Sequence, residues 1–476
     1  MVPAVTGGQP SDRPGDPACP PGQARQAALE ALAYLDGGGG FLREELHALF
    51  ERLSLPTRDR ALATQLAAGA VRHRRTLRLV LSHLRGKAGR AAEIQPKLRR
   101  VLELGAFQLL FLDRVPAYAA INEAVEAARQ ASGGRQRERA AGFVNGMLRG
   151  LQRLIAGRQA DGRPARDAIP HPEGGVVRLR ANVLPDAKES LAAFLGAAYS
   201  YPDWLVARWL KELGEKAEEV CRWGNRRPHL LARANPLRHT PAELLEMLRK
   251  ESPEVAPGPR PGTLDVSALD PAHLETLLAE GSLTVQDPSA MAAVEALAPA
   301  PGENVLDLCA SPGTKTTQIV EAMGDRGRIV AADRTEEKLA PVRRTVAARN
   351  LANVTVCLSA DVAAAAPPGG FDAALVDAPC SNTGVLARRV EARWRLRPEN
   401  LAELPRLQHK LLAEAAAMVR PGGRLVYSTC SLQREENSGV IETFLRAHVK
   451  WRAAGQDLIL PGPDHDGAFW ARLESV

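Results

Sequence analysis

Asn304-Val-Leu-Asp-Leu-Cys-Ala-Ser-Pro-Gly-Thr-Lys-Thr-Thr-Gln318 is the stretch that decides the fold of this 476-residue chain. The run from Val305 to Leu308 is apolar except for Asp307, which is typical of a buried parallel strand. Small residues and Gly313 interrupt the run, and helical character resumes at Lys315. A strand, a small-residue loop and a helix start open a doubly wound α/β domain, whose ligands lie beyond the strand carboxyl ends. The spacing matches neither the Walker phosphate loop nor the dinucleotide-binding glycine pattern.

Four predicted strands each deliver an aspartate at or just past the carboxyl end. Asp307 belongs to the first strand, Asp333 ends the second (328–332), Asp361 follows the third (354–358), and Asp377 ends the fourth (371–376). An acid at the end of the second strand is placed to accept both ribose hydroxyls of a nucleoside cofactor. A single aspartate is as easily a helix N-cap, but four in this register favour S-adenosylmethionine, which carries an adenosine and an ammonium group.

Length and composition predict a cytoplasmic protein of roughly three domains at about 150 residues each. The first 22 residues are rich in Pro, Gly and Asp and lack the apolar region of a signal peptide, so we expect a disordered leader. No apolar run approaches the length needed to span a membrane. The cysteines fit no zinc spacing or disulfide framework, so we expect reduced thiols and no metal. They lie at positions 19, 221, 309, 357, 380 and 430.

The net charge of +7 is unevenly distributed. Residues 23–155 contain 22 Lys/Arg and 12 Asp/Glu, a net charge of +10, so the remainder of the chain carries −3. A basic module joined to a nearly neutral remainder indicates that the protein binds a polyanion, most simply nucleic acid. The alternative is an ordinary solvated face.

The basic region is predicted to be all-helical, because its apolar residues recur at helical spacing between turn signals. The expected helices cover 24–35, 41–53, 57–84, 91–112, 121–132 and 137–155. Basic residues cluster on the third helix and just after it: Arg72, Arg74, Arg75, Arg78, Arg85, Lys87 and Arg90.

The remaining chain divides into three predicted parts. Residues 156–180 have no apolar period and are predicted to be a linker. Residues 181–281 are predicted to form a small α+β domain, with a strand at 230–235 and a helix at 241–250. Four of its arginines are equally consistent with RNA contact or a solvated surface: Arg226, Arg227, Arg233 and Arg238. The domain opened by residue 282 extends to residue 476.

Two cysteines are hard to explain as core residues. Cys380 follows the fourth strand in Asp377-Ala-Pro-Cys380, and Cys430 follows the fifth strand (424–427) in Ser428-Thr-Cys-Ser431. A lone cysteine is usually a small buried hydrophobe, as we expect for Cys309, but these two lie where the cofactor is predicted. A thiolate adding to C6 of cytosine makes C5 nucleophilic towards a sulfonium methyl group. A second group must then move the C5 proton, and an acid near N3 offsets the charge that develops.

The chain also resembles known families. Residues 104–116, 121–126 and 142–149 are similar to the NusB-like RNA-binding fold, and residues 181–281 to the small domain that precedes the catalytic domain in RNA cytosine methyltransferases. Residues 281–476 resemble the catalytic domain of the RNA cytosine-C5 methyltransferases with two active-site cysteines. Together they resemble the bacterial 16S ribosomal RNA (cytosine-C5) methyltransferase family, RsmB/Fmu. This implies an all-α NusB-like domain, a small α+β domain and a Rossmann-like S-adenosylmethionine methyltransferase domain.

The resemblance assigns roles to individual residues. Cys430 is implied as the nucleophile and Cys380 as the group that assists product release, with Asp377 as the catalytic acid. The implied cofactor-binding residues are Cys309, Ala310, Ser311, Pro312, Gly313, Thr314, Lys315, Asp333, Lys338, Asp361 and Asp377. Ser311, Thr314 and Asn382 depart from the residues usual in the family.

We therefore expect methylation at C5 of a cytidine in 16S ribosomal RNA, by a monomer with an RNA partner and no membrane association. The target base must be unstacked to admit a thiolate at C6, so a loop or unfolded segment is the expected substrate. A second hypothesis keeps the chemistry but changes the substrate to tRNA, another RNA or DNA. A third, of a different class, is a non-catalytic RNA-binding or antitermination-type factor.

Overall fold

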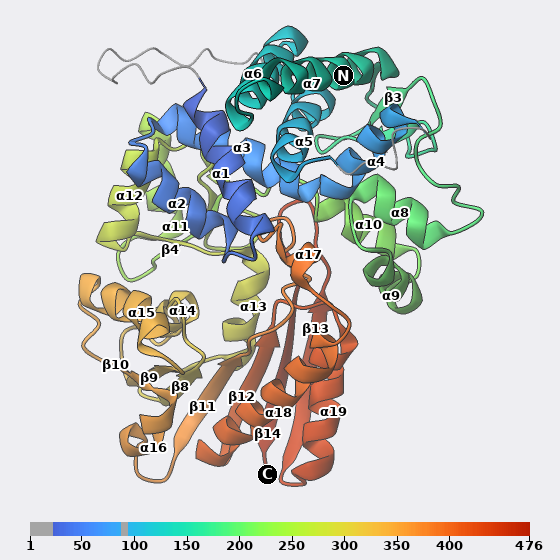
Figure 1. Cartoon of the computed structure of the whole chain (residues 1–476). Helices are drawn as coiled ribbons and strands as arrows, with labels where there is room; N and C mark the ends of the chain where they lie inside the picture. Colours follow the sequence, from blue (N-terminus) through green and yellow to red (C-terminus); the bar gives the residue numbers. More distant parts are fainter. Residues whose placement is uncertain (1–21, 87–93) are drawn as a thin grey trace. The chain divides into compact units, whose positions relative to one another are not determined.

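The computed structural model describes residues 22–86 and 94–476. The chain divides into two compact units, Met1–Ser200 and Tyr201–Val476, and Figure 1 labels their elements. The predicted leader, with Cys19, and the basic residues Lys87 and Arg90 lie outside the described residues, apart from Gly22 at the leader's end.

The first unit begins with a helical bundle, as the apolar spacing predicted. Its helices are α1 (Gln23–Asp36), α2 (Leu42–Arg52), α3 (Thr57–Arg72), α4 (Arg74–Arg85), α5 (Pro96–Phe111), α6 (Ala117–Ala131) and α7 (Gln136–Leu154). The single helix predicted over 57–84 is wrong, because the chain leaves helical geometry at His73. His73 is buried, and its ring stacks on Phe111 with the centroids 4.2 Å apart. Tertiary packing at this residue therefore separates α3 from α4.

Two glycines allow close packing in this bundle. A Cβ on Gly69 of α3 would lie 1.9 Å from the ring of Phe107 on α5, and one on Gly105 would lie 2.7 Å from Leu148 on α7. The helices can approach this closely only because these positions carry no side chain.

The linker predicted for residues 156–180 is wrong, because these residues contain strands. Residues 155–179 form a three-stranded antiparallel sheet in the order β1-β3-β2, built from β1 (Ile155–Gln159), β2 (Ala168–Pro170) and β3 (Val176–Leu179). Ile169 and Val176 are fully buried, but strands of three to five residues are too short to show an apolar period. The first unit also includes α8 (Leu191–Tyr199), where Ala197 O accepts a hydrogen bond from Thr76 Oγ1 at 2.7 Å. The small domain was predicted to start at residue 181, but α8 belongs to the first unit.

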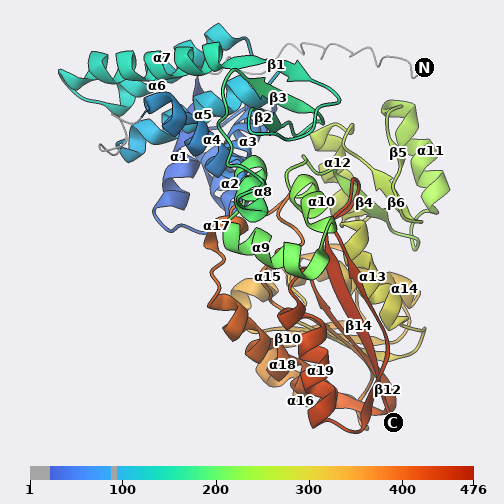
Figure 2. The ribbon, with the colours of Figure 1, turned by 90° about the vertical axis from the view of Figure 1, so that its right-hand side faces the viewer.

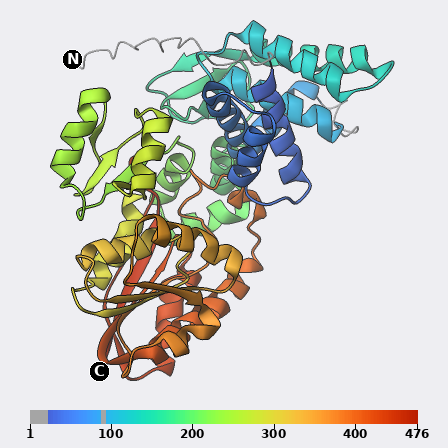
Figure 3. The ribbon, with the colours of Figure 1, turned by 90° about the vertical axis from the view of Figure 1, so that its left-hand side faces the viewer.

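The second unit opens with a small α+β region. Its antiparallel sheet has the order β5-β6-β4-β7, with β4 (Leu231–Ala234), β5 (Ala256–Pro257), β6 (Thr263–Asp265) and β7 (Leu283–Val285). The accompanying helices are α9 (Asp203–Leu213), α10 (Lys216–Trp223), α11 (Pro241–Glu251) and α12 (Pro271–Glu280). A capping box between Thr240 and Glu243 fixes the start of α11. Figure 3 shows α11 and α12 with this sheet as a yellow-green lobe.

A buried ion pair joins this lobe to the rest of the second unit. Arg233 on β4 donates two hydrogen bonds to the carboxylate of Glu321, at 2.7 and 2.9 Å. Because both side chains are buried, removal of either would leave an uncompensated charge. Arg233 is therefore structural, which resolves one of the four arginines left open by the sequence.

The remainder of the second unit contains a seven-stranded sheet in the order β10-β9-β8-β11-β12-β14-β13. Its strands are β8 (Asn304–Leu308), β9 (Arg328–Asp333), β10 (Val354–Leu358), β11 (Phe371–Asp377), β12 (Val419–Thr429), β13 (Trp451–Ile459) and β14 (Ala468–Ser475). The first five in this order are parallel, and β14 runs antiparallel to both of its neighbours. The predicted Rossmann-like α/β fold is confirmed, with a mixed sheet.

Helices cover both faces of this sheet, as Figure 2 shows nearly edge-on. They are α13 (Pro288–Leu297), α14 (Thr314–Ala322), α15 (Glu336–Ala348), α16 (Val362–Ala365), α18 (Asn400–Met418) and α19 (Ser438–Ala447), whereas the short α17 (Ala392–Arg395) lies beyond the strand ends. Leu306 packs in a core with residues of α18 and α19, whereas its neighbour Val305 packs with residues of α13 and α14. The alternation follows from the two-residue period of a strand, and it leaves the strand carboxyl ends open for a site.

Candidate active site

The cofactor loop predicted from the sequence connects β8 to α14. The backbone N–H groups of Cys309 and Ala310 both donate to Ala332 O on β9, each at 2.9 Å, which ties the loop to the neighbouring strand end. Gly313 has φ +104° and immediately precedes α14, a conformation that favours glycine. Cys309 is buried, as expected, and burial raises the pKa of its thiol to about 12.

Asp333 lies at the end of β9 beside this loop. One carboxylate oxygen accepts from Ser311 N at 3.2 Å, and the other from Arg334 N at 2.7 Å. Lys338 Nζ lies 3.2 Å from the second oxygen. On the next strand Leu358 pairs with Asp333 in register, so the exposed Asp361 follows an adjacent strand end. The two acids thus follow successive strand ends on the same side of the loop.

Asp307 is a buried carboxyl group beneath the loop. One of its oxygens accepts a hydrogen bond from Thr316 Oγ1 at 2.6 Å, and the other has no hydrogen-bond partner among residues 22–86 and 94–476. Burial, with a smaller contribution from the charge of Asp377, raises the pKa of Asp307 to about 7. A set of carboxylates around a small-residue loop suits a ligand that carries ribose hydroxyls, an ammonium group and a sulfonium.

The two cysteines singled out in the sequence lie together. Cys380 Sγ and Cys430 Sγ are 3.2 Å apart, although 50 residues separate them in the chain. The parallel register of β11 and β12 pairs Asp377 with Ser428, so the loops that carry the cysteines start side by side. The hydrogen bond with Cys430 and burial raise the pKa of Cys380 well above its usual value.

Asp377 connects the cysteines to the cofactor loop. Its Oδ2 lies 2.5 Å from Lys315 Nζ, and its Oδ1 accepts from Ser428 Oγ at 2.8 Å. Burial of Lys315 acts to lower its pKa, but the charge of Asp377 and, to a smaller extent, that of Cys430 leave the pKa raised. A charged lysine therefore lies between the predicted cofactor site and the two thiols.

Each part of this architecture matches a known protein family. Residues 294–463 match the family model "16S rRNA methyltransferase RsmB/F", residues 22–153 match "NusB family", and residues 201–262 match the RsmF/B-like ferredoxin-like domain. The chain is 34% identical to the "Probable ribosomal RNA small subunit methyltransferase B" of Synechocystis sp., over 95% of this chain and 99% of the relative. It is 31% identical to the ribosomal RNA small subunit methyltransferase B of Vibrio cholerae, over 94% and 96%. The chain belongs to this methyltransferase family.

Solved structures agree on the fold of the methyltransferase. The crystal structure of PH0851 has 24% identity and a TM-score of 0.72, covering 96% of this chain and 99% of that one. A methyltransferase homolog from Pyrococcus horikoshii has 23% identity and a TM-score of 0.53, covering 60% and 99%. The family model and the relatives confirm the predicted family, the enzyme class and the cofactor S-adenosylmethionine, and they show RNA methylation as the activity. They do not favour the hypothesis of a purely non-catalytic factor.

The sequence reasoning missed one residue that connects both cysteine loops of the methyltransferase. Glu436, in the short helix η2 (Arg434–Glu436), is fully buried. Its Oε1 accepts from Ser381 N at 2.8 Å and Gln408 Nε2 at 3.1 Å, and its Oε2 accepts from Ser381 Oγ and Ser431 Oγ, each at 2.5 Å. Ser381 follows Cys380 and Ser431 follows Cys430, so one carboxylate holds both loops. The glutamate is close to Cys430 in sequence, but nothing in its local pattern indicated burial.

Asn382 shapes the remaining side of the cysteine pair. Its Oδ1 lies 3.3 Å from Cys430 Sγ, and its Nδ2 donates to Cys380 O at 2.9 Å. The residue has φ +60°, a left-handed conformation that asparagine tolerates better than most residues. The departure from the family noted at this position therefore contacts both cysteines.

Among residues 22–86 and 94–476, no group of three or more His, Cys, Asp or Glu residues could hold a metal ion. Over the same ranges, no helix combines the length and apolar character needed to cross a membrane.

Proposed function

We propose that this methyltransferase modifies C5 of a cytidine in 16S ribosomal RNA through a covalent adduct between Cys430 and C6 of the base. The observation that carries the proposal is the 3.2 Å contact between Cys380 and Cys430, beside an aspartate that is itself paired with the cofactor loop. Two thiols and a carboxylate are the three types of group that this chemistry requires.

In the proposed reaction the Cys430 thiolate forms a bond to C6, and the electrons of the C5–C6 double bond move to make C5 nucleophilic. S-adenosylmethionine, when bound, supplies the methyl group that C5 receives. We assign to Asp377 the hydrogen bonds to the base near N3 and its amine. Lys315 Nζ lies 2.5 Å from Asp377 Oδ2 and holds that carboxylate at the cofactor loop.

Product release requires loss of the C5 proton and cleavage of the Cys430–C6 bond. We assign the proton transfer to Cys380, which is in direct contact with Cys430. The raised pKa of Cys380 means that its thiol is protonated at rest, so the thiol first releases its proton to a water molecule. The resulting thiolate is a strong base. When this base removes the proton, the electrons of the C5–H bond restore the double bond and expel the Cys430 thiolate.

Two single substitutions test these roles. Cys430→Ala should lower methyl transfer by about 10³-fold or more, with S-adenosylmethionine affinity nearly unchanged. Cys380→Ala should accumulate an RNA–protein adduct that survives denaturing electrophoresis and disappears when Cys430 is also replaced. Cys357→Ala is the matched control, because this half-buried cysteine lies on β10. The mechanism is wrong if Cys380→Ala neither traps RNA nor loses turnover.

The substrate assignment needs a separate measurement. The family model and the relatives support ribosomal RNA of the small subunit, whereas tRNA or another RNA would use the same chemistry. Labelled methyl groups should enter purified 16S rRNA and be mapped by mass spectrometry to a 5-methylcytidine. Incorporation into tRNA alone would change the substrate assignment to tRNA and leave the proposed adduct unchanged.

A further inference from the structure

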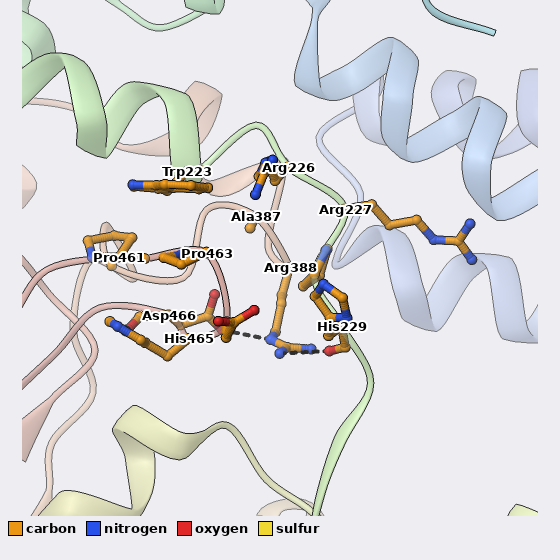
Figure 4. Close-up of a pocket in the computed structure, with 15 residues that line it drawn as sticks. Trp223, Arg226, Arg227, His229, Ala387, Arg388, Pro461, Pro463, His465 and Asp466 are labelled. Atoms are coloured by element: carbon orange, nitrogen blue, oxygen red, sulfur yellow. Dashed lines mark hydrogen bonds and ion pairs between the residues drawn. The ribbon is translucent and has the colours of Figure 1, made fainter. Parts of the chain in front are cut away.

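A pocket without an assigned role lies next to the cysteine loops (Figure 4). Three segments of the second unit line it. They are the segment from Trp223, the last residue of α10, to His229, the segment Gly384–Arg388, and the turn Pro461–Asp466 between β13 and β14. They come from the small α+β lobe, the loop after Cys380 and the last hairpin of the large sheet.

Backbone hydrogen bonds connect this pocket directly to the proposed nucleophile. Gly384 N donates to Cys430 O at 2.8 Å, and Gly467 N donates to Gly384 O at 2.8 Å. A Cβ on Gly384 would lie 2.5 Å from Gly467 O and 2.8 Å from Cys430 O, so this close packing requires glycine. A substrate whose target base reaches Cys430 therefore has its neighbouring groups close to the pocket.

Most charged groups at the pocket are paired with one another. Arg388 binds the buried Asp466 at 2.7 Å and Asp287 at 3.0 Å, and His229 Nδ1 lies 2.7 Å from Asp265. Arg226 and Arg227 make no ion pair in the part of the chain that the structure describes. The exposed Asp464 is the acid that opposes them.

An aromatic surface accompanies these arginines. The half-buried indole of Trp223 has the guanidinium groups of Arg222 and Arg226 each 4.6 Å from its ring centroid. Figure 4 shows the indole on one side of the pocket, Pro461 and Pro463 across from it, and Arg227 extending away. An indole and guanidinium planes beside unpaired positive charge are the groups on which unstacked bases of single-stranded RNA are held.

We propose that this pocket binds a nucleotide of the RNA substrate that flanks the target cytidine. Its base stacks against Trp223, and Arg226 and Arg227 contact the phosphate backbone. The inference rests on the proposed function, which places an RNA base at Cys430, and adds the residues that hold the adjacent chain. The proposal also gives the arginines of the small lobe different roles. Arg233 is a buried structural residue, whereas Arg226 and Arg227 line the pocket.

The test compares RNA kinetics of Trp223→Leu, Arg226→Gln and Arg227→Gln with those of a matched control, Arg238→Gln. Arg238 is an exposed arginine of the same lobe that does not line the pocket. Loss of a base stack or phosphate contact should raise KM for 16S rRNA by roughly 5- to 100-fold. The value of kcat at saturating RNA and the affinity for S-adenosylmethionine should remain within about twofold of wild type. Trp223→Phe should restore most of the loss caused by Trp223→Leu.

Two further readouts distinguish RNA contact from a structural role. Each arginine substitution should reduce the slope of log affinity against log salt by about 0.7, the value for one phosphate contact on a single strand. Iodouridine placed at the positions flanking the target should cross-link on irradiation to the peptide that contains Trp223.

The outcomes separate the pocket from the chemistry. If wild-type protein and Cys380→Ala behave as proposed while the Trp223 and arginine variants match Arg238→Gln, the pocket does not bind RNA. Equal losses in all four variants, or a loss of S-adenosylmethionine affinity, would also overturn it, because the effect would then be general. If wild-type protein forms no 5-methylcytidine, it is the proposed function that fails.

Discussion

At the scale of single residues, the site places ionisable groups where their protonation is set by burial and by neighbours. Asp307 is an example, because one oxygen accepts a hydrogen bond from Thr316 and the other has no partner within the part of the chain that the structure describes. Lys315 shows the opposite balance, since burial lowers its pKa but the charge and hydrogen bond of Asp377, together with smaller contributions from other neighbours, leave the pKa raised. Groups with perturbed pKa values cluster at functional sites, and here they surround the loop that the sequence indicated first.

The raised pKa of Asp307 predicts a dependence of stability on pH. Because the pKa is about 7 in the folded protein and 3.8 when unfolded, the folded state binds more protons between these values. Stability contributed by this group is therefore fully present below pH 3.8 and is lost as the pH rises to 7. The full effect is on the order of 4 kcal/mol.

Asp307→Asn removes this titration. Urea unfolding at pH 5 and pH 8 should show the variant gaining a few kcal/mol relative to wild type at the higher pH. A constant difference between the two proteins across this range would show that Asp307 does not titrate as proposed.

At the scale of secondary-structure elements, parallel strands bring distant loops together. The neighbouring strands β11 and β12 end in register, and the loops after them carry Cys380 and Cys430. The short helix η2 then supplies Glu436, whose carboxylate accepts hydrogen bonds from both loops. We infer that Glu436 is a positioning residue, which acts through the cysteines and does not itself contact the base.

Glu436→Gln tests this inference. The amide replaces one acceptor by a donor, so the loops should shift and kcat should fall by about 10²-fold, as expected for a misplacement near 1 Å. Affinity for S-adenosylmethionine should change little, and adduct formation in the Cys380→Ala background should slow in parallel. Glu435→Gln is the control in the same helix, since Glu435 pairs with Arg208. Equal losses in both variants would indicate a general effect on η2.

At the scale of the whole molecule, the chain contains two compact units. All six tryptophans lie between residues 204 and 470 and therefore in the second unit. The first unit contributes mainly helices, which circular dichroism detects. Spectroscopy can thus follow the units separately without cutting the chain.

We predict two unfolding transitions, because multidomain proteins commonly depart from two-state behaviour. Circular dichroism should report both, and tryptophan fluorescence only that of residues 201–476. S-adenosylmethionine at 100 times its Kd should stabilise the fluorescent transition by about 2.7 kcal/mol and leave the other unchanged. Coincident transitions that shift together would show that the units unfold as one.

The sequence by itself determined the strand–loop–helix around Asp307, the acids that follow successive strands and the two cysteines beyond strand ends. These signals are local, because apolar periodicity and turn residues act over a few positions. Only the tertiary structure decided the break at His73, the small sheet where a linker was predicted, the buried pairing of Arg233 and the position of Glu436. Those features depend on contacts between residues far apart in the chain, which follow from strand register and packing and leave no periodic trace in the sequence.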